Sequence, residues 1–136
     1  MLATRNRLRT STDFSTTVRS GVRNGRRNLV LYTAALPAGE PSRIGFIVSK
    51  SVGNAVVRNL VKRRLREAGA LSLRTYPVGY AIVVRALPAS ASAGWETLRN
   101  EYDAALEATL KRLAGRAQPA VAKVSSETPQ EGTPRA

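Results

Sequence analysis

The chain has 136 residues, of which 43% are hydrophobic and 23% charged, which suits one domain with a modest core. Lysine and arginine number 22 against 9 acidic residues, and a net charge of +13 indicates a polyanionic partner. Cysteine and histidine are absent, which excludes disulfides, thiolate metal sites, imidazole bases and thiol nucleophiles. No signal peptide and no apolar run near the roughly 18 residues of a membrane span is visible, so we expect a soluble, cytoplasmic protein.

The chain opens with a basic arm, residues 1–9, in which arginines alternate with other residues: Arg5, Arg7 and Arg9. A hydroxyl side chain at positions 10–12 can cap a short helix over residues 13–20, which Gly21 would end. In that helix Phe14 and Val18 lie four residues apart and share one face. They belong either to the core or to a groove open to a ligand, and the sequence leaves both interpretations open.

Three segments have the apolar patterns of β-strands. Residues 21–28 read as a turn-rich basic loop, and residues 28–35 follow as a strand that carries Tyr32. Residues 43–50 predict a second strand, antiparallel to the first across a turn at 37–42. Both of its sides are apolar, so we expect it to be central and covered on both faces. Residues 80–86 predict a third strand, also central.

The helix predicted over residues 52–70 organises the rest of the sequence. Gly53 and Asn54 can supply its N-cap, and Gly69 would end it in the left-handed conformation. At about 100° per residue, its basic and amide side chains fall in one arc of roughly 140°. These side chains are Arg58, Asn59, Lys62, Arg63 and Arg66. The opposite arc is apolar and is interrupted only by Arg64.

A charged helix face is usually a solvated face, but that explanation fits this helix poorly. Glu67 is the only local counter-charge, and like charges four residues apart repel each other by a few tenths of a kcal/mol in the free protein. A purely structural helix would relieve this repulsion with glutamate. The pattern therefore favours a phosphate-binding helix.

The last helix contrasts with the basic one. Residues 95–113 predict an amphipathic helix whose polar side mixes acids and bases, as an ordinary solvated surface does. Residues 115–136 are rich in Pro, Ala, Ser, Thr and Glu without a period, and they predict a disordered tail. The expected organisation is one domain over residues 1–114, followed by that tail.

The polypeptide is better suited to binding than to catalysis. None of its nine acidic residues forms a D-x-D or D-x-x-E cluster near a strand end that would hold a metal ion. A DNA-binding helix-turn-helix needs a short helix just before the basic helix, and a strand is predicted there instead. The strand-helix-strand context and the Arg, Lys and Asn side chains fit RNA, with Phe14 and Tyr32 as candidate stacking platforms.

Several segments, in this order, resemble the protein component of bacterial ribonuclease P. They are RNRL at 5–8, DF at 13–14, NLVLYT at 28–33 and RIGFIVSKSVGNAVVRNLVKRRLREA at 43–68. The resemblance covers about residues 5–113, and its centre is the long pattern VSK-x-VGNAV-x-RN-x-x-KR-x-x-RE at 48–67. It implies an α/β sandwich in which a mixed sheet of about four strands packs with three helices, including a rare left-handed βαβ crossover.

The resemblance also implies a function. The family assists an RNA subunit, which is the catalyst, in removing the 5′ leader from precursor tRNA by Mg²⁺-dependent hydrolysis. The Mg²⁺ would be held mainly by the RNA, and the partners would be the ribonuclease P RNA subunit and precursor tRNA. The protein would raise substrate affinity, screen phosphate repulsion and broaden the substrate range. We expect no membrane association, and a monomer outside the ribonucleoprotein.

Residue roles follow from the matching positions. The five polar positions of the basic helix would pack against the catalytic RNA, while Phe14, Val18 and Tyr32 would line a cleft for the single-stranded leader. Candidates for additional basic contacts are Arg5, Arg7, Arg9 and Lys50. Leu60 replaces a basic residue common in the family, which removes one expected phosphate contact. Val18 replaces a common aromatic residue, which keeps the apolar lining but not the stacking ring.

Two alternatives use the same features. A general RNA-binding or ribosome-associated protein would share the basic helix, but it would bind many structured RNAs equally and support no cleavage. A DNA-binding regulator is the third hypothesis, which competition between duplex DNA and RNA would test.

Overall fold

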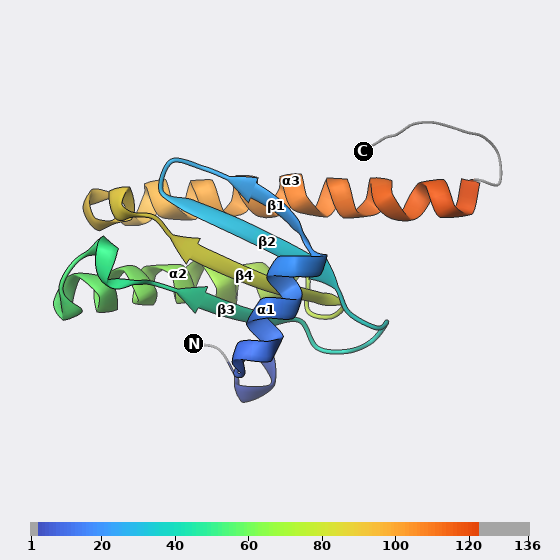
Figure 1. Ribbon diagram of the computed structural model, residues 1–136, viewed down its shortest axis with the longest axis horizontal. Helices are drawn as coiled ribbons and strands as arrows, with labels where there is room; N and C mark the ends of the chain where they lie inside the picture. The colour runs from blue at the N-terminus through green and yellow to red at the C-terminus, as the bar shows by residue number, and fades with distance from the viewer. Residues whose placement is uncertain (1–2, 123–136) are drawn as a thin grey trace.

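The computed structural model describes residues 3–122, and a mixed four-stranded sheet is at its centre (Figure 1). The strands are β1 (Val22–Gly25), β2 (Leu29–Ala35), β3 (Arg43–Ile47) and β4 (Tyr80–Ala86). Their order in the sheet is β1-β2-β4-β3. The β1–β2 and β2–β4 pairs are antiparallel, and β3 and β4 are parallel.

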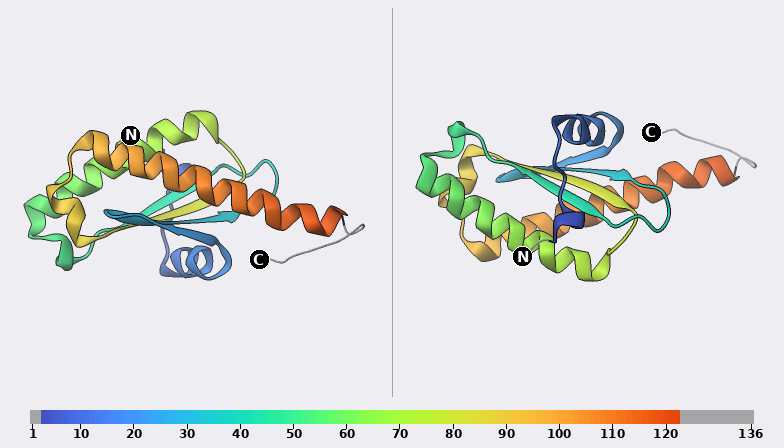
Figure 2. Two further views of the ribbon diagram at one scale, coloured as in Figure 1. Left: turned by 90° about the horizontal axis from the view of Figure 1, so that it is seen from above. Right: turned by 90° about the horizontal axis from the view of Figure 1, so that it is seen from below.

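Helices cover both faces of the sheet. The long helices α2 (Ala55–Thr75) and α3 (Trp95–Ala122) lie on one face, and α1 (Ser11–Ser20) crosses the other (Figure 2). Single-turn 3-10 helices lie at Thr4–Asn6, Lys50–Val52 and Pro88–Ser92. The predicted α/β class, with four strands and three α-helices, is confirmed.

The connection from β3 through α2 to β4 joins two adjacent parallel strands. In the view of Figure 1 both strands point to the left, β4 lies above β3, and α2 passes behind the sheet. This path is a left-handed crossover, a handedness that only about 2% of such connections have. The handedness implied by the family resemblance is therefore confirmed.

The hydrophobic core lies between the sheet and the α2–α3 layer. Its largest fully buried members include Leu29, Leu31, Ile44, Leu65, Ile82 and Tyr102. Two buried hydrogen bonds fix the layers: the Thr33 and Thr109 hydroxyls are 2.9 Å apart, as are those of Ser72 and Tyr102. Burial raises the pKa of the Tyr102 phenol, so this hydroxyl stays neutral and available for its hydrogen bond.

Two strand predictions were wrong. Residues 22–25, predicted as loop, form the edge strand β1, because they pair with β2 in continuous register from Val22 opposite Thr33 to Gly25 opposite Val30. The segment predicted at 43–50 is a strand only over 43–47, and it lies at the other edge of the sheet instead of in the centre. It runs antiparallel to β2, but β4 lies between the two. The central position of 80–86 is confirmed.

The ends of the long helices also differ from the prediction. Gly69 does not end α2, which continues for six residues to Thr75 and is capped where the Tyr76 N–H donates to Ser72 O at 2.9 Å. A side chain at Gly69 would place its Cβ 3.2 Å from Ile44 and from Phe46, so this glycine allows the helix to approach β3 closely. Helix α3 extends to Ala122, so residues 115–122 of the predicted tail are helical, and residues 123–136 lie outside the described part.

The capping predictions at the helix starts are confirmed. The Thr10 hydroxyl accepts from the Asp13 N–H at 3.0 Å at the start of α1, and the Asn54 side chain accepts from the Val57 N–H at 3.0 Å at the start of α2. The Gly21 N–H donates to Thr17 O at the end of α1.

Gly21 provides a test of the tight connection between α1 and β1. An added Cβ would lie 2.6 Å from the carbonyl oxygen of Thr17 and 2.7 Å from that of Thr33, and both are backbone atoms that cannot rotate away. Gly21→Ala should therefore lower the free energy of unfolding by about 1–3 kcal/mol. Gly25→Ala, which meets nothing within 4 Å, is the matched control and should stay within about 0.5 kcal/mol of the parent. Denaturant unfolding measures both, and equal values would contradict the close packing.

Candidate RNA-binding site

The five polar positions predicted on the basic helix lie together on α2, and we call them the α2 basic surface. They are Arg58, Asn59, Lys62, Arg63 and Arg66. Asn59, Arg63 and Arg66 are exposed, while Arg58 and Lys62 are half-buried. Arg58 is oriented by its Nε, which donates to Gly53 O at 3.1 Å. The other three cations form no hydrogen bond or ion pair within residues 3–122, so their donors are available to a ligand.

Arg64, the residue that interrupts the apolar arc, has a structural role. Its Nη1 donates to Ala93 O at 2.8 Å, which ties α2 to the connection before α3. The side chain is half-buried and is not part of the α2 basic surface. The sequence pattern placed Arg64 on the core side correctly but could not identify its acceptor.

Phe14 and the α2 basic surface meet at one pocket of about 180 Å³. Its lining includes Phe14 from α1, Gly45 from β3, and Lys62 and Arg66 from α2. The Phe14 ring packs directly over Gly45, at the place where any side chain on that residue would have to lie. An aromatic ring and two cations thus border the same cavity, although they come from opposite faces of the sheet and are separated in the sequence by about fifty residues.

Val18 lines a neighbouring pocket of about 360 Å³ between α1 and the sheet. Phe14 borders both pockets, and the rest of the second lining comes from α1, β3 and β4: Ser15, Val18, Arg19, Ile47 and Arg85. Arg85 stands opposite Ile47 in β3 and opposite Val30 in β2, so a cation lies on the floor of this cleft between apolar neighbours. Phe14 and Val18 are half-buried, line these pockets and are not part of the main hydrophobic core, so the groove interpretation stays a prediction that this geometry supports.

Tyr32 lies on the same sheet face but lines neither pocket. It stands opposite Val83 in β4 and Arg23 in β1, and Val83 in turn stands opposite Gly45. Two strand spacings, about 10 Å, therefore separate Tyr32 from the glycine beneath Phe14. Tyr32 is half-buried, and it continues the α1-facing surface of the sheet from the pockets toward β1.

The basic arm runs along the outer edge of β3, between α1 and α2. The Leu8 N–H donates to Ile44 O at 3.1 Å, and the Asn6 amide donates to Ser42 O at 2.8 Å. These bonds place Arg7 on the wall of the smaller pocket, with exposed Arg5 and Arg9 on either side of it in the sequence. Lys50 is exposed in the 3-10 turn that precedes α2. The four additional cations thus flank the elements that carry Phe14 and the α2 basic surface.

Sequence reasoning missed Arg19 and Arg85. Arg85 had a visible signal, because it is the only charged residue in the apolar strand YAIVVRA. Ile82 and Val84 of the same strand point into the core. Because successive side chains of a strand point to opposite faces, Arg85 lies on the other face of the sheet, where α1 lies. Arg19 had no signal beyond its exposure on α1.

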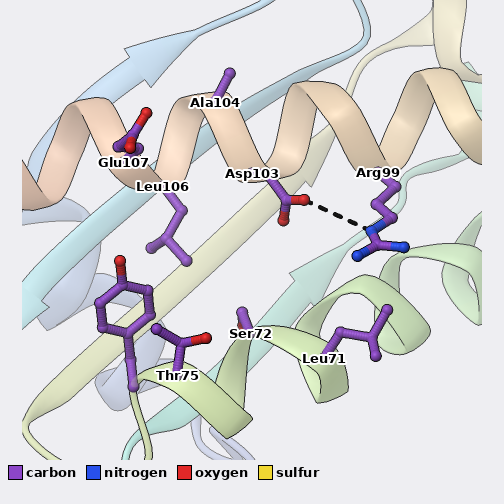
Figure 3. A pocket seen from close by; sticks show the side chains of 9 residues that line it. Leu71, Ser72, Thr75, Arg99, Asp103, Ala104, Leu106 and Glu107 are labelled. Carbon is purple, nitrogen blue, oxygen red and sulfur yellow. Dashed lines mark ion pairs between the residues drawn. The ribbon is translucent and has the colours of Figure 1, made fainter.

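A third pocket, of about 470 Å³, lies between α2 and α3 and contains none of the predicted site residues (Figure 3). Its charged lining residues are Arg99, Asp103 and Glu107, and Arg99 pairs with Asp103 at 3.6 Å. One cation against two carboxylates leaves the pocket with a negative balance, which disfavours phosphate. This surface is therefore unsuited to RNA.

The described residues do not form a protein-held metal site. Within residues 3–122 no three His, Cys, Asp or Glu side chains are grouped so that they could hold a metal ion. The same part of the chain has no helix long and apolar enough to cross a bilayer. The fold and the site thus define an α/β protein in which a cleft containing an aromatic ring is flanked by cations, an arrangement suited to a polyanionic ligand.

The comparisons with known proteins agree on one family. The family model described as Ribonuclease P matches residues 2–110, so the chain belongs to the ribonuclease P protein family. It is 82% identical to the ribonuclease P protein component of Pseudarthrobacter chlorophenolicus over the full length of both chains. It is 56% identical to that of Kocuria rhizophila, covering 84% of this chain and all of the relative.

Solved structures support the same assignment. The Staphylococcus aureus RNase P protein superposes with a TM-score of 0.65 at 29% identity, covering 79% of this chain and 94% of that one. The Thermotoga maritima RNase P protein superposes with a TM-score of 0.61 at 26% identity, covering 82% of this chain and 97% of that one. The chain is thus an auxiliary protein subunit of an endoribonuclease that matures tRNA, and the general RNA-binding alternative is not favoured.

Proposed function

We propose that the α2 basic surface binds the ribonuclease P RNA subunit, and that the cleft between α1 and the sheet binds the single-stranded 5′ leader of precursor tRNA. The observation that carries this proposal is the pocket shared by Phe14, Lys62 and Arg66. It allows an unstacked base to contact an aromatic face while neighbouring phosphates contact cations. The two RNAs would then meet on one protein, which raises the affinity of the complex for precursor.

The cations contribute through charge and position. Two RNA backbones that approach each other repel, and the α2 basic surface with the basic arm would screen this repulsion. Mg²⁺ supplies the activated nucleophile and the charge stabilisation for hydrolysis, and in this proposal the RNA subunit holds it. The chain's own residues bind and orient RNA in the cytoplasm, and screening should reduce the Mg²⁺ concentration that the complex requires.

The salt dependence of RNA-subunit binding tests the assignment of the α2 basic surface. Arg58→Ala and Arg63→Ala should each lower the slope of log affinity against log salt by about one unit, because each removes one phosphate contact. Arg99→Ala, which removes an exposed arginine beside the α2–α3 pocket, is the matched control and should leave the slope unchanged. Unchanged slopes in both α2 variants would exclude this surface as the RNA contact.

Arg85 tests the leader cleft separately from the α2 basic surface. Arg85→Ala should weaken binding of a precursor with a leader by about tenfold, since losing one stacking or phosphate contact costs about 1–3 kcal/mol. Binding of mature tRNA, which has no leader, should not change. Arg85→Lys keeps the charge but not the planar guanidinium, so it separates phosphate contact from stacking. Equal losses for both RNAs would contradict the placement of the leader in this cleft.

A further inference from the structure

The basic arm is held against the sheet by a side chain that the proposed function does not use. Asn6 is half-buried, and its side-chain amide donates to Ser42 O at 2.8 Å. Two residues further along both segments, the Leu8 N–H donates to Ile44 O at 3.1 Å. Arg7 also forms an isolated parallel β-bridge with Ile44. The basic arm therefore adds a short strand-like segment to the outer edge of β3.

The Asn6 side chain takes the place of a backbone donor in this pairing. The Asn6 backbone N–H donates to Ala3 O at 2.9 Å, inside the 3-10 turn Thr4–Asn6, so it is not available to β3. In a parallel ladder that continued from the Leu8 bond toward the N-terminus, the next donor would be the N–H of residue 6, with Ser42 O as its acceptor. The side-chain amide reaches that acceptor instead. An alanine at position 6 would have no donor for it.

The acceptor of this bond belongs to a fixed part of the sheet. Ser42 is fully buried, its N–H donates to Pro77 O at 3.0 Å, and its hydroxyl accepts from the Tyr80 N–H at 3.2 Å. Ser42 is thereby tied to the start of the central strand β4. Because the acceptor is held in place, the bond from Asn6 sets the position of the basic arm.

The basic arm, held in this way, borders the α2 basic surface. The right-hand view of Figure 2 shows the arm passing in front of β3, from the side of α2 to α1. Arg7 and Leu8 line the pocket that contains Lys62 and Arg66. None of the arm residues 3–9 lines the neighbouring pocket, which contains Arg85. The basic arm therefore belongs with the α2 basic surface and not with the leader cleft.

We propose that Asn6 is a positioning residue for binding of the RNA subunit: it holds the basic arm in the conformation in which Arg5 and Arg7 reach phosphates beside the α2 basic surface. The inference rests on the proposed function, because it assumes that this surface binds the RNA subunit. A segment that is ordered before binding loses less conformational entropy when the complex forms. A variant whose arm is docked for only a fraction of the time binds more weakly by that fraction.

Asn6→Ala tests this role without removing a charge. Loss of one neutral hydrogen bond should reduce the affinity for the RNA subunit by about two- to tenfold at every salt concentration. The slope of log affinity against log salt should not change, because every cation is retained. Arg7→Ala, in contrast, should lower that slope by about one unit. Asn100→Ala, which removes an exposed amide on α3, is the matched control and should alter neither quantity.

Hydrogen exchange of the Leu8 N–H in the free protein reports whether the basic arm is released. Ile44 O protects this amide, so Asn6→Ala should accelerate its exchange by about two- to tenfold. Unchanged exchange would overturn the role of Asn6 in holding the arm. Faster exchange with unchanged affinity for the RNA subunit would make that role purely structural and would also overturn the proposal.

Two comparisons separate this inference from the leader cleft and from the proposed function. The preference of the protein–RNA complex for precursor over mature tRNA should not change in Asn6→Ala, and a loss confined to this preference would contradict the assignment of the arm to the RNA subunit. If Arg63→Ala lowers the RNA-subunit slope and Asn6→Ala has no effect, only this inference fails. If Arg58→Ala and Arg63→Ala also leave the slope unchanged, the proposed function fails with it.

Discussion

Two glycines allow the helices on opposite faces of the sheet to approach the edge strand β3, and the site depends on this close packing. Gly45 leaves room for the Phe14 ring on the α1 side, and Gly69 brings α2 against Ile44 and Phe46 on the other. Because β3 is an edge strand, side chains from both helices reach the same pocket beside it, and Arg7 and Leu8 of the basic arm also line that pocket. The aromatic ring and the α2 cations consequently border one pocket.

Positive and negative side chains lie on different sides of the helical layer formed by α2 and α3. Within residues 3–122 the cations of the α2 basic surface have no carboxylate partner, and acidic side chains line the pocket between α2 and α3. Like charges four residues apart on α2 cost the free protein a few tenths of a kcal/mol per pair. A phosphate backbone removes that repulsion and releases its own counterions on binding, so the arrangement that is unfavourable in the free protein favours the complex.

The sequence was sufficient to predict features that one segment determines by itself. The α2 basic surface follows from helical periodicity, and the central strand at 80–86 follows from its apolar run. The caps at Thr10 and Asn54 follow from local side-chain chemistry. The family resemblance added the left-handed crossover, which no local pattern indicates because general chain statistics favour the opposite hand.

Features that depend on distant residues could not be predicted. The segment VRNG of β1 has the composition of a turn and is a strand because β2 pairs with it. Gly69 looks like a helix end, but its close approach to Ile44 and Phe46 depends on residues more than twenty positions away. Arg85 was visible as a charge in an apolar strand, yet its role required the register that sets it beside Ile47 and across from α1.

The central claim is that this chain assists an RNA catalyst instead of acting alone. The most direct measurement is cleavage of a 5′-extended precursor tRNA by a bacterial ribonuclease P RNA at low Mg²⁺, with and without the protein. We expect cleavage at the mature 5′ end only when the protein is present, because its cations replace part of the screening that Mg²⁺ otherwise provides. A protein that binds both RNAs and leaves the cleavage rate unchanged would contradict the account.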